Sequence, residues 1–433
     1  MDKHLIEINI PEKFRAINKA DIWLDGITVV SGINGCGKST ISKLLYQTYK
    51  YSIQYNRLIT SDVNEKLKPY YDVLNQLYTI ILIHKRQSPP FGTRRWRYLK
   101  NLERSEEYLH EVEELCHNFL EEERRTIEEY DDSLMTERTW RIIWSSLDNE
   151  GDKDLASNFD RLYAQMSAII KEAQLLSQER PSSILKNKIA SSLRNELPST
   201  IEVSEYGDPF IGLNAKSVAL PHYIQHVLYL DTPMMYGIDA YNCPENWDEL
   251  NTYLKEPLSG NYGGIIRDTI QKEILHGEAI YDDESIDDDI TFKREDGKVF
   301  SLFDCATGVK SFSILQLLYK NGYLKKDTLL IVDEPEAHLH PQWIVEYARL
   351  ILLLHKEIGV KFFIASHSTD MVGALKEIAP TLDVKDLNFY VAEEAGDYTY
   401  NYRYLADDVE AIFASFNKSY EKLDYFVSHG KNK

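Results

Sequence analysis

The chain has 433 residues, which is enough for two or three domains with cores of their own. Its net charge of −20 excludes a generally basic nucleic-acid-binding protein, although a local basic cluster is compatible with that charge. The four cysteines show no CxxC spacing, so we expect neither a disulfide framework nor a cysteine metal site. There is no apolar signal core at the N-terminus and no apolar stretch of about 18 residues, which predicts a cytoplasmic protein without membrane contact.

The N-terminal part contains three predicted strands followed by a phosphate-binding motif. Leu5–Ile10 alternates apolar and polar residues, and Ile22–Leu24 is a second short apolar run. Ile27–Val30 is β-branched and apolar, as expected of a buried strand. The pattern G-x-x-x-x-G-K-[ST] then fits Gly32–Ser39 without a mismatch, and a chance match in a chain of this length is on the order of a per cent or two.

This motif has the residue types that phosphate binding requires. Its glycines allow a tight turn, so that backbone N–H groups point at an anion at the N-terminus of the helix predicted from Ile41 to Thr48. Lys38 can reach the β- and γ-phosphates, and the Ser39 hydroxyl can ligate Mg²⁺. The residues expected to contact ATP are Gly32, Asn34, Gly35, Cys36, Gly37, Lys38, Ser39 and Thr40.

The segment from residue 50 to residue 199 is predicted to be a helical insertion. Amphipathic patterns over Trp96–Tyr130 and Leu155–Ser177 are typical of a helical hairpin or short coiled coil. A basic cluster with interleaved aromatic residues overlaps the first pattern. Pairing with the acidic face of that helix is favoured, and contact with nucleic acid or with a partner protein are the alternatives. The cluster comprises Lys85, Arg86, Arg94, Arg95, Trp96, Arg97, Tyr98 and Lys100.

Strand character returns after the insertion. Ile201–Val203 and Val227–Leu230 are apolar runs, and the second is expected to rejoin the nucleotide-binding sheet. Two acidic runs between residues 282 and 289 are interpreted as a solvated loop, because they lack the ligand spacing of a calcium-binding loop. Phe292–Phe300, with Asp296-Gly297 at its centre, predicts a β-hairpin.

Two apolar runs near the C-terminus end in polar residues. Thr328–Val332 is followed by Asp333 and Glu334, and Lys361–Ala365 leads to His367. The carboxyl ends of parallel strands share one edge of a sheet, so these side chains are expected beside the phosphate loop. There Asp333 would hold Mg²⁺, Glu334 would polarise the attacking water, and His367 would contact the γ-phosphate. The alternatives are a solvated Asp-Glu turn and a structural histidine.

Thr307 and Gly308 follow the predicted hairpin and open another apolar-periodic helix. A small hydroxyl residue with glycine at a helix N-terminus can bind an anion. A plain N-cap is the alternative.

These pieces, in this order, resemble the ABC-type ATPases, in the branch that contains the SMC-like and OLD-like proteins. The run Asp333–Pro341 is similar to the D-E-P-E-x-x-L-H-P segment of OLD-like AAA-type ATPases. The resemblance covers about residues 1–49 and 290–380. It implies an α/β fold, with a mixed sheet flanked by helices as an ABC-type P-loop core and a large helical or coiled-coil insertion. Two departures, Ala306-Thr307-Gly308-Val309 in place of L-S-G-G and His340 in place of Asp, fit the OLD-like branch.

The resemblance also implies a domain division and a composite site. The nucleotide-binding domain would comprise residues 1–49 and 200–405, with the insertion at 50–199 and a helical tail at 406–433. A homodimer or higher homo-oligomer would sandwich ATP, with Thr307 and Gly308 of one copy capping the nucleotide of the other. Arg15 would also touch the nucleotide. The family's Q-loop glutamine has no assigned position in this sequence.

The resemblance further implies an ATPase in which Lys38, Glu334 and His367 act in hydrolysis. It would be a subunit of a bacterial anti-phage defence complex, in a Septu-like or PARIS-like arrangement that controls a separate effector, an HNH or Toprim nuclease. One alternative is an SMC-like DNA-repair or recombination ATPase that acts directly on DNA. Another is a nucleotide-gated scaffold in which hydrolysis is dispensable.

Overall fold

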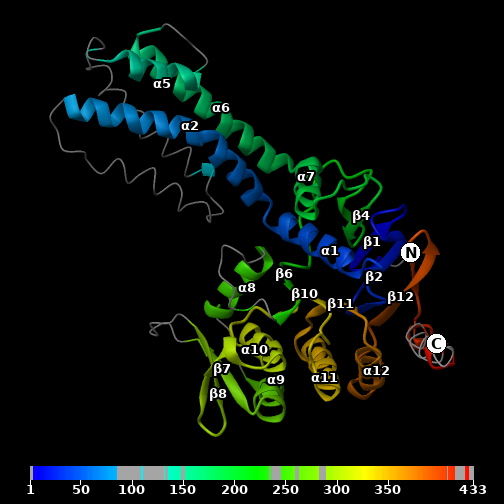
Figure 1. Cartoon of the computed structure of the whole chain (residues 1–433). Coiled ribbons are helices and arrows are strands. Elements are labelled where there is room, and N and C mark those ends of the chain that lie inside the picture. Colours follow the sequence, from blue (N-terminus) through cyan, green and yellow to red (C-terminus); the bar gives the residue numbers. More distant parts are fainter. Residues whose placement is uncertain are drawn as a thin grey trace. The chain divides into compact units, whose positions relative to one another are not determined.

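The structure is a computed structural model that divides the chain into two compact units (Figure 1). The first unit comprises Met1–Ile53 and Ser182–Lys433, and the second comprises Gln54–Pro181. The structure describes residues 3–84, 109–110, 131, 135–147, 152–233, 236, 245–258, 263–281, 289–406, 408–414 and 425–428.

A ten-stranded sheet in the order β5-β4-β1-β2-β13-β12-β3-β11-β10-β6 forms the centre of the first unit. The run from β12 through β3, β11 and β10 to β6 is parallel, β13 is antiparallel to β12, and β2 is parallel to β13. The other pairings are antiparallel. The strands are β1 (Ile6–Ile10), β2 (Ile17–Leu24), β3 (Ile27–Ser31), β4 (Glu202–Glu205), β5 (Asp208–Ile211), β6 (His226–Leu230), β10 (Thr328–Asp333), β11 (Lys361–Ser366), β12 (Leu387–Gly396) and β13 (Thr399–Tyr404).

Helices of the first unit cover both faces of this sheet, and a small antiparallel sheet adjoins them. The helices are α1 (Lys38–Ile53), α7 (Ser182–Leu193), α8 (Glu245–Lys255), α9 (Gly264–Asp268), η4 (Thr269–Ile274), η5 (Leu302–Asp304), α10 (Thr307–Lys320), α11 (Pro341–Ile358), α12 (Thr369–Ile378) and η6 (Ala379–Leu382). The small sheet consists of β7 (Gly277–Tyr281), β8 (Ile290–Arg294) and β9 (Val299–Ser301).

The central strands are continuous apolar runs because helices pack on both of their faces. Every residue of β3 and β10 is buried. On β6, Leu228 and Leu230 join the core that contains α10, α11 and α12, whereas Tyr229 stacks on Tyr46 of α1 with ring centroids 5.4 Å apart. Thus α1 covers one face and α10–α12 the other (Figure 1). The predicted fold class, a mixed sheet flanked by helices, is confirmed.

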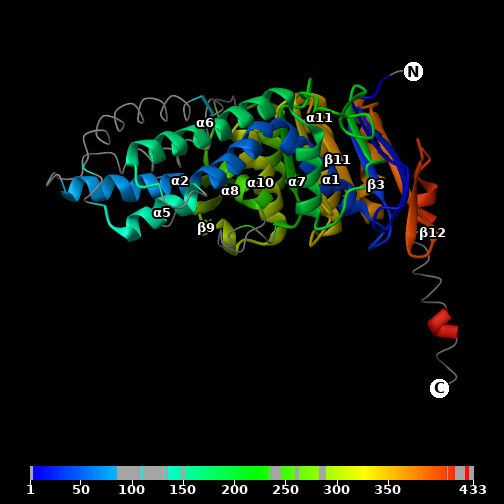
Figure 2. The ribbon, with the colours of Figure 1, turned by 90° about the horizontal axis from the view of Figure 1, so that it is seen from above.

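Two further predictions about the sheets are confirmed. The apolar run at Val227–Leu230 rejoins the main sheet, because β6 pairs in parallel with β10. The predicted hairpin over Phe292–Phe300 forms from β8 and β9. Figure 2 shows the main sheet from above, running from β11 through β3 to β12.

The first unit contains one helix that we expected in the insertion. The predicted boundary was residue 199, but the chain returns to the first unit at Ser182, so α7 belongs to that unit. Lys186 Nζ donates to the Gly212 carbonyl at 2.7 Å, and Ser192 Oγ lies 3.0 Å from the Tyr51 hydroxyl of α1. These contacts tie α7 to the first unit.

The second unit is helical wherever the structure describes regular elements. They are α2 (Tyr55–His84), α5 (Glu137–Leu147) and α6 (Leu155–Glu179). Helix α6 matches the predicted pattern over Leu155–Ser177, and the Asp154 side chain caps it by accepting from the backbone N–H groups of Ala156 and Ser157. The basic cluster, the acidic runs at 282–288 and nearly all of Trp96–Tyr130 lie outside the described residues. Over the described ranges, no helix has the combination of length and apolar character that crossing a membrane requires.

Candidate active site

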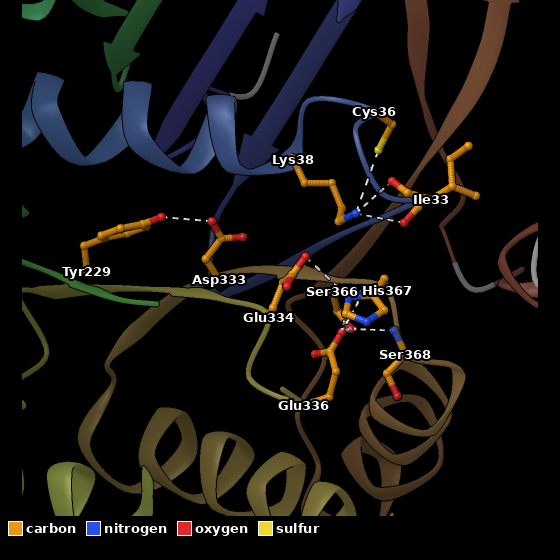
Figure 3. A network of polar contacts seen from close by, with 11 residues as sticks. Ile33, Cys36, Lys38, Tyr229, Asp333, Glu334, Glu336, Ser366, His367 and Ser368 are labelled. Carbon is orange, nitrogen blue, oxygen red and sulfur yellow. Dashed lines mark hydrogen bonds and ion pairs between the residues drawn. The ribbon is translucent and has the colours of Figure 1, made fainter. Parts of the chain in front are cut away.

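The topology brings three loops to one edge of the sheet. Strand β11 lies between β3 and β10 and pairs in parallel with both. In register, Ser366 lies opposite Ser31, and Ala365 lies opposite Asp333. The phosphate loop, Asp333-Glu334 and His367 therefore follow three neighbouring strand ends, as Figure 3 shows. This is the edge at which α/β sheets bind ligands.

The phosphate loop has the backbone that its sequence predicts. Gly35 and Gly37 have φ angles of +83° and +102°, in the left-handed region that favours glycine. A Cβ on Gly37 would also lie 2.7 Å from Ile17 Cγ1 of β2. Helix α1 begins at Lys38, directly after this turn, so its N-terminus faces the loop.

Lys38 lies folded against this loop. The side chain is 4% exposed, and Nζ donates to the carbonyls of Gly32 at 2.8 Å and Ile33 at 3.1 Å. Carbonyl oxygens are the partners that a buried ammonium needs. The structure thus places the positive charge of Lys38 inside the loop that is predicted to bind phosphate.

Sequence reasoning missed Tyr402, which supports the phosphate loop from β13. Its hydroxyl donates to the Cys36 carbonyl at 3.2 Å and lies 3.8 Å from the Cys36 sulfur. Burial raises the pKa of Tyr402 well above its ordinary value, so the hydroxyl keeps its proton and remains a donor. Tyrosine is common in strands of any sheet, so its identity gave no signal for this contact.

Asp333, at the end of β10, has the properties of a cation ligand. Its side chain is 6% exposed, and Tyr229 donates a hydrogen bond to Oδ2 at 2.9 Å. Burial raises the pKa of Asp333, and the neighbouring hydroxyl groups of Ser39 and Tyr229 oppose that rise. Oδ1 is buried without a hydrogen-bond partner among the described residues. An unpaired carboxylate oxygen beside a hydroxyl fits Mg²⁺, which prefers such ligands.

Glu334 adopts a backbone conformation that is unusual for its type. Its φ is +55°, and its N–H donates to the Ala365 carbonyl at 2.8 Å. Non-glycine residues in this region are strained and occur preferentially at functional sites. The turn leaves the carboxylate 41% exposed, with Oε1 3.5 Å from His367 Nδ1. Glu334 is therefore available to a water molecule at this edge.

His367 lies between Glu334 and a second carboxylate that sequence reasoning did not assign. Glu336 Oε1 accepts from Ser366 Oγ at 2.9 Å and from the His367 backbone N–H at 2.6 Å, and it lies 3.2 Å from His367 Nδ1 (Figure 3). Burial raises the pKa of Glu336. The sequence signal was the second acid of the D-E-P-E run, which we interpreted as a family signature alone.

The other candidate residues make structural contacts within this chain. Thr307 is the first residue of α10, where Ala306 occupies the N-cap position, so the plain N-cap alternative for Thr307 is wrong. A Cβ on Gly308 would lie 2.3 Å from Trp343 Cε3, which gives this glycine a packing reason. Arg15 donates to the carbonyl of Leu193 at the end of α7. Contact of these residues with nucleotide stays a prediction.

Comparison with known families decides the assignment. Residues 5–372 match the family described as AAA ATPase domain. The chain belongs to this family. Its AAA ATPase domain contains the mixed sheet described above, with β11 between the phosphate-loop strand and the Asp333 strand. The family match includes the phosphate loop, Asp333, Glu334 and His367. A search of curated proteins gives no match.

Solved structures similar to this AAA ATPase include two SMC heads and an ABC transporter component. The Smc head domain from Pyrococcus furiosus, with an extended coiled coil and bound to the C-terminal domain of ScpA, is 14% identical with 98% of both chains covered and a TM-score of 0.34. The SMC head domain from Thermotoga maritima is 10% identical, with 93% of this chain and 99% of that chain covered and a TM-score of 0.38. The structure of cbiO1 from Clostridium perfringens, part of the ABC transporter complex cbiONQ, is 11% identical, with 98% of this chain and 99% of that chain covered and a TM-score of 0.34.

Proposed function

We propose that this AAA ATPase binds ATP with Mg²⁺ at the sheet edge and hydrolyses it. The observation that carries the proposal is the convergence of Lys38, Asp333, Glu334 and His367 from three neighbouring strand ends. A phosphate loop, a carboxylate with an unpaired oxygen and a half-exposed acid are the parts that phosphoryl transfer to water requires.

Each residue has one role in the proposed reaction. The loop amides and Lys38 bind the β- and γ-phosphates, and Ser39 and Asp333 hold Mg²⁺, which neutralises phosphate charge when bound. Glu334 accepts a proton from water as the water oxygen attacks the γ-phosphorus. The bond from this phosphorus to the bridging oxygen breaks, and ADP leaves. His367 donates a hydrogen bond to a γ-phosphate oxygen.

We further propose that two copies assemble around the nucleotide, as a homodimer or within a higher homo-oligomer. Glu334 and His367 are 41% and 36% exposed in one chain, so a second copy has access to them. Thr307 and Gly308 lie in the first turn of α10, where backbone N–H groups and the helix dipole favour an anion. They would supply the contact of the second copy.

The cellular role that we propose is that of an ATPase subunit in bacterial anti-phage defence. Its nucleotide state would control a separate effector protein, an HNH or Toprim nuclease. The support is the similarity of Asp333–Pro341 to the OLD-like segment, since a P-loop fold by itself does not define a biological role.

The test combines phosphate release with molar mass by light scattering, with and without ATP and Mg²⁺. We expect turnover in the wild type, its loss in Lys38→Ala and Glu334→Gln, and wild-type turnover in Glu346→Gln, which changes a carboxylate on α11. The mass should rise with ATP and remain raised in Glu334→Gln. Absence of turnover in the wild type would refute hydrolysis. A monomer that turns over ATP would refute the proposal that Thr307 and Gly308 contact the nucleotide of a second copy.

The same preparation separates the alternatives. An ATPase that acts directly on DNA would show DNA-stimulated turnover that is lost when Arg94, Arg95 and Arg97 are replaced. A nucleotide-gated scaffold would keep its biological activity in Glu334→Gln although turnover stops. Either result would replace the proposed role in controlling an effector by hydrolysis.

A further inference from the structure

The carboxylate of Glu336 is the centre of the polar network beside His367 (Figure 3). The side chain is 5% exposed, and its Oε1 accepts hydrogen bonds from Ser366 Oγ and from the His367 backbone N–H. The same oxygen lies 3.2 Å from His367 Nδ1. One carboxylate oxygen therefore fixes the backbone of His367 and also faces its ring.

Two carboxylates compete for this ring nitrogen. Nδ1 is 3.2 Å from Glu336 Oε1 and 3.5 Å from Glu334 Oε1, and it makes no hydrogen bond to either among the described residues. A protonated ring nitrogen has one hydrogen, so it makes one strong hydrogen bond at a time. Glu336 is the nearer acceptor and is buried, whereas Glu334 is half-exposed, and an electrostatic interaction is stronger where water is excluded. A protonated Nδ1 is therefore attracted more strongly to Glu336 than to Glu334.

We propose that Glu336 is a positioning residue for hydrolysis, which binds the Nδ1 proton of His367, directs Nε2 to the γ-phosphate and leaves Glu334 free to accept a proton from water. The inference rests on the proposed hydrolysis at Glu334. Without the charge on Glu336, Nδ1 of His367 would donate its hydrogen bond to Glu334 instead. A carboxylate that accepts this hydrogen bond is a weaker base for water.

The surrounding backbone makes the arrangement rigid. The Glu334 N–H is bonded to the Ala365 carbonyl, which joins the loop after β10 to β11. Ser366 Oγ accepts from the Ser368 N–H at 3.0 Å, and Ser368 caps α12 through the Met371 N–H. Both carboxylates and the ring are thus attached to elements whose ends are fixed, as a positioning role requires.

Stability does not account for a carboxylate at this position. Burial raises the pKa of Glu336, and its Oε2 is buried with no hydrogen-bond partner in the described part of the chain. A buried charge with one unpaired oxygen is unfavourable for folding. A glutamine would keep an acceptor for Ser366 and for the His367 N–H without that charge. A residue that is unfavourable for stability and lies beside the reacting groups is explained by function.

The test is a double-mutant cycle with Glu336→Gln and His367→Ala, measured as kcat, KM and affinity for a fluorescent ATP analogue. We expect Glu336→Gln to lower kcat by about tenfold, within the range for residues that orient a catalytic group, while analogue affinity changes less than about twofold. In the His367→Ala background, the same change should alter kcat by less than about twofold. The thermal unfolding midpoint of Glu336→Gln should equal or exceed that of the wild type.

The controls separate this inference from the proposed function. Glu346→Gln, a change of the same type on α11, should leave kcat unchanged. Wild-type kcat in Glu336→Gln, or an equal loss with and without His367, would refute the positioning role alone. An inactive wild type would refute the proposed hydrolysis and this inference together. An active Glu334→Gln variant would refute the role of Glu334 as base, and this inference with it.

Discussion

Replacing Tyr229 with phenylalanine removes one hydroxyl beside the carboxylate that we assign to Mg²⁺. The Tyr229 hydroxyl donates to Asp333 Oδ2 at 2.9 Å, and both side chains are buried. Asp333 Oδ1 is already without a hydrogen-bond partner among the described residues. The variant therefore leaves Ser39 as the other hydroxyl that acts on this carboxylate. The aromatic ring and its stacking on Tyr46 are retained.

The expected loss of unfolding free energy follows from this geometry. A hydrogen bond to a charged group contributes about 1.5–3 kcal/mol net. The Tyr229 hydroxyl is itself desolvated by burial, and phenylalanine relieves that cost, so we expect a loss of about 1.5 kcal/mol. This is roughly a tenfold change in the unfolding equilibrium. Urea denaturation followed by tryptophan fluorescence measures it, provided that the m-value is unchanged.

Magnesium and nucleotide supply the decisive comparison. A cation on Asp333 satisfies the carboxylate in both proteins, so the difference between Tyr229→Phe and the wild type should shrink when Mg²⁺ and ATP are added. Tyr46→Phe is the matched control, because its hydroxyl donates to the half-buried Glu249 at the longer distance of 3.3 Å. We expect a loss of about 0.5 kcal/mol there, independent of Mg²⁺. Wild-type stability in Tyr229→Phe, or a loss that Mg²⁺ and ATP do not change, would refute the reasoning.

Three further predictions test other parts of the structure. Gly308→Ala should lower the thermal unfolding midpoint, because overpacking against Trp343 costs about 1–3 kcal/mol and the gain in helix propensity is about 1 kcal/mol. Gly373→Ala, in α12 where the nearest atom is 3.7 Å away, should raise the midpoint instead. Gly37→Ala should weaken ATP-analogue binding by about tenfold or more, since φ is +102° and the facing strand is close, and wild-type affinity would contradict this. Because burial raises the pKa of Glu336, the folded protein loses stability relative to the unfolded chain as pH rises from the ordinary carboxyl pKa to the raised one. The unfolding midpoint of Glu336→Gln, measured at increasing pH, should therefore rise relative to that of the wild type.

The sequence predicted the elements whose residue pattern matches their environment. The strands that carry the site are continuous apolar runs, because helices bury both faces of the sheet. The sequence alone predicted that Asp333, Glu334 and His367 lie close together, since the carboxyl ends of neighbouring parallel strands share an edge. The phosphate loop could also be predicted, because its spacing of glycine, lysine and serine is required by few other structures.

Contacts between residues far apart in the chain left no comparable signal. Tyr402 and Cys36 are separated by 366 positions, and Tyr229 and Asp333 by 104. Tyrosine suits a strand in any sheet, so its identity did not reveal the partner of its hydroxyl. The predicted C-terminal boundary of the insertion differs from the observed one for the same reason. The pattern of α7 is helical in either unit, and only its contacts with α1 and the Gly212 carbonyl decide where it belongs.

Three unfavourable features of this fold lie at the edge of the sheet that carries the candidate site. Asp333 and Glu336 each bury a carboxylate oxygen that lacks a partner within the described ranges, and Glu334 has a strained backbone. A bound cation would pair with the unpartnered carboxylate oxygen of Asp333. It would not pair with the carboxylate of Glu336. Nucleotide with Mg²⁺ should therefore stabilise the fold by more than the loop contacts alone supply, because it also pairs a buried charge. The cost that remains at Glu336 is then specific to catalysis, which is why stability and turnover should respond to its replacement in opposite directions.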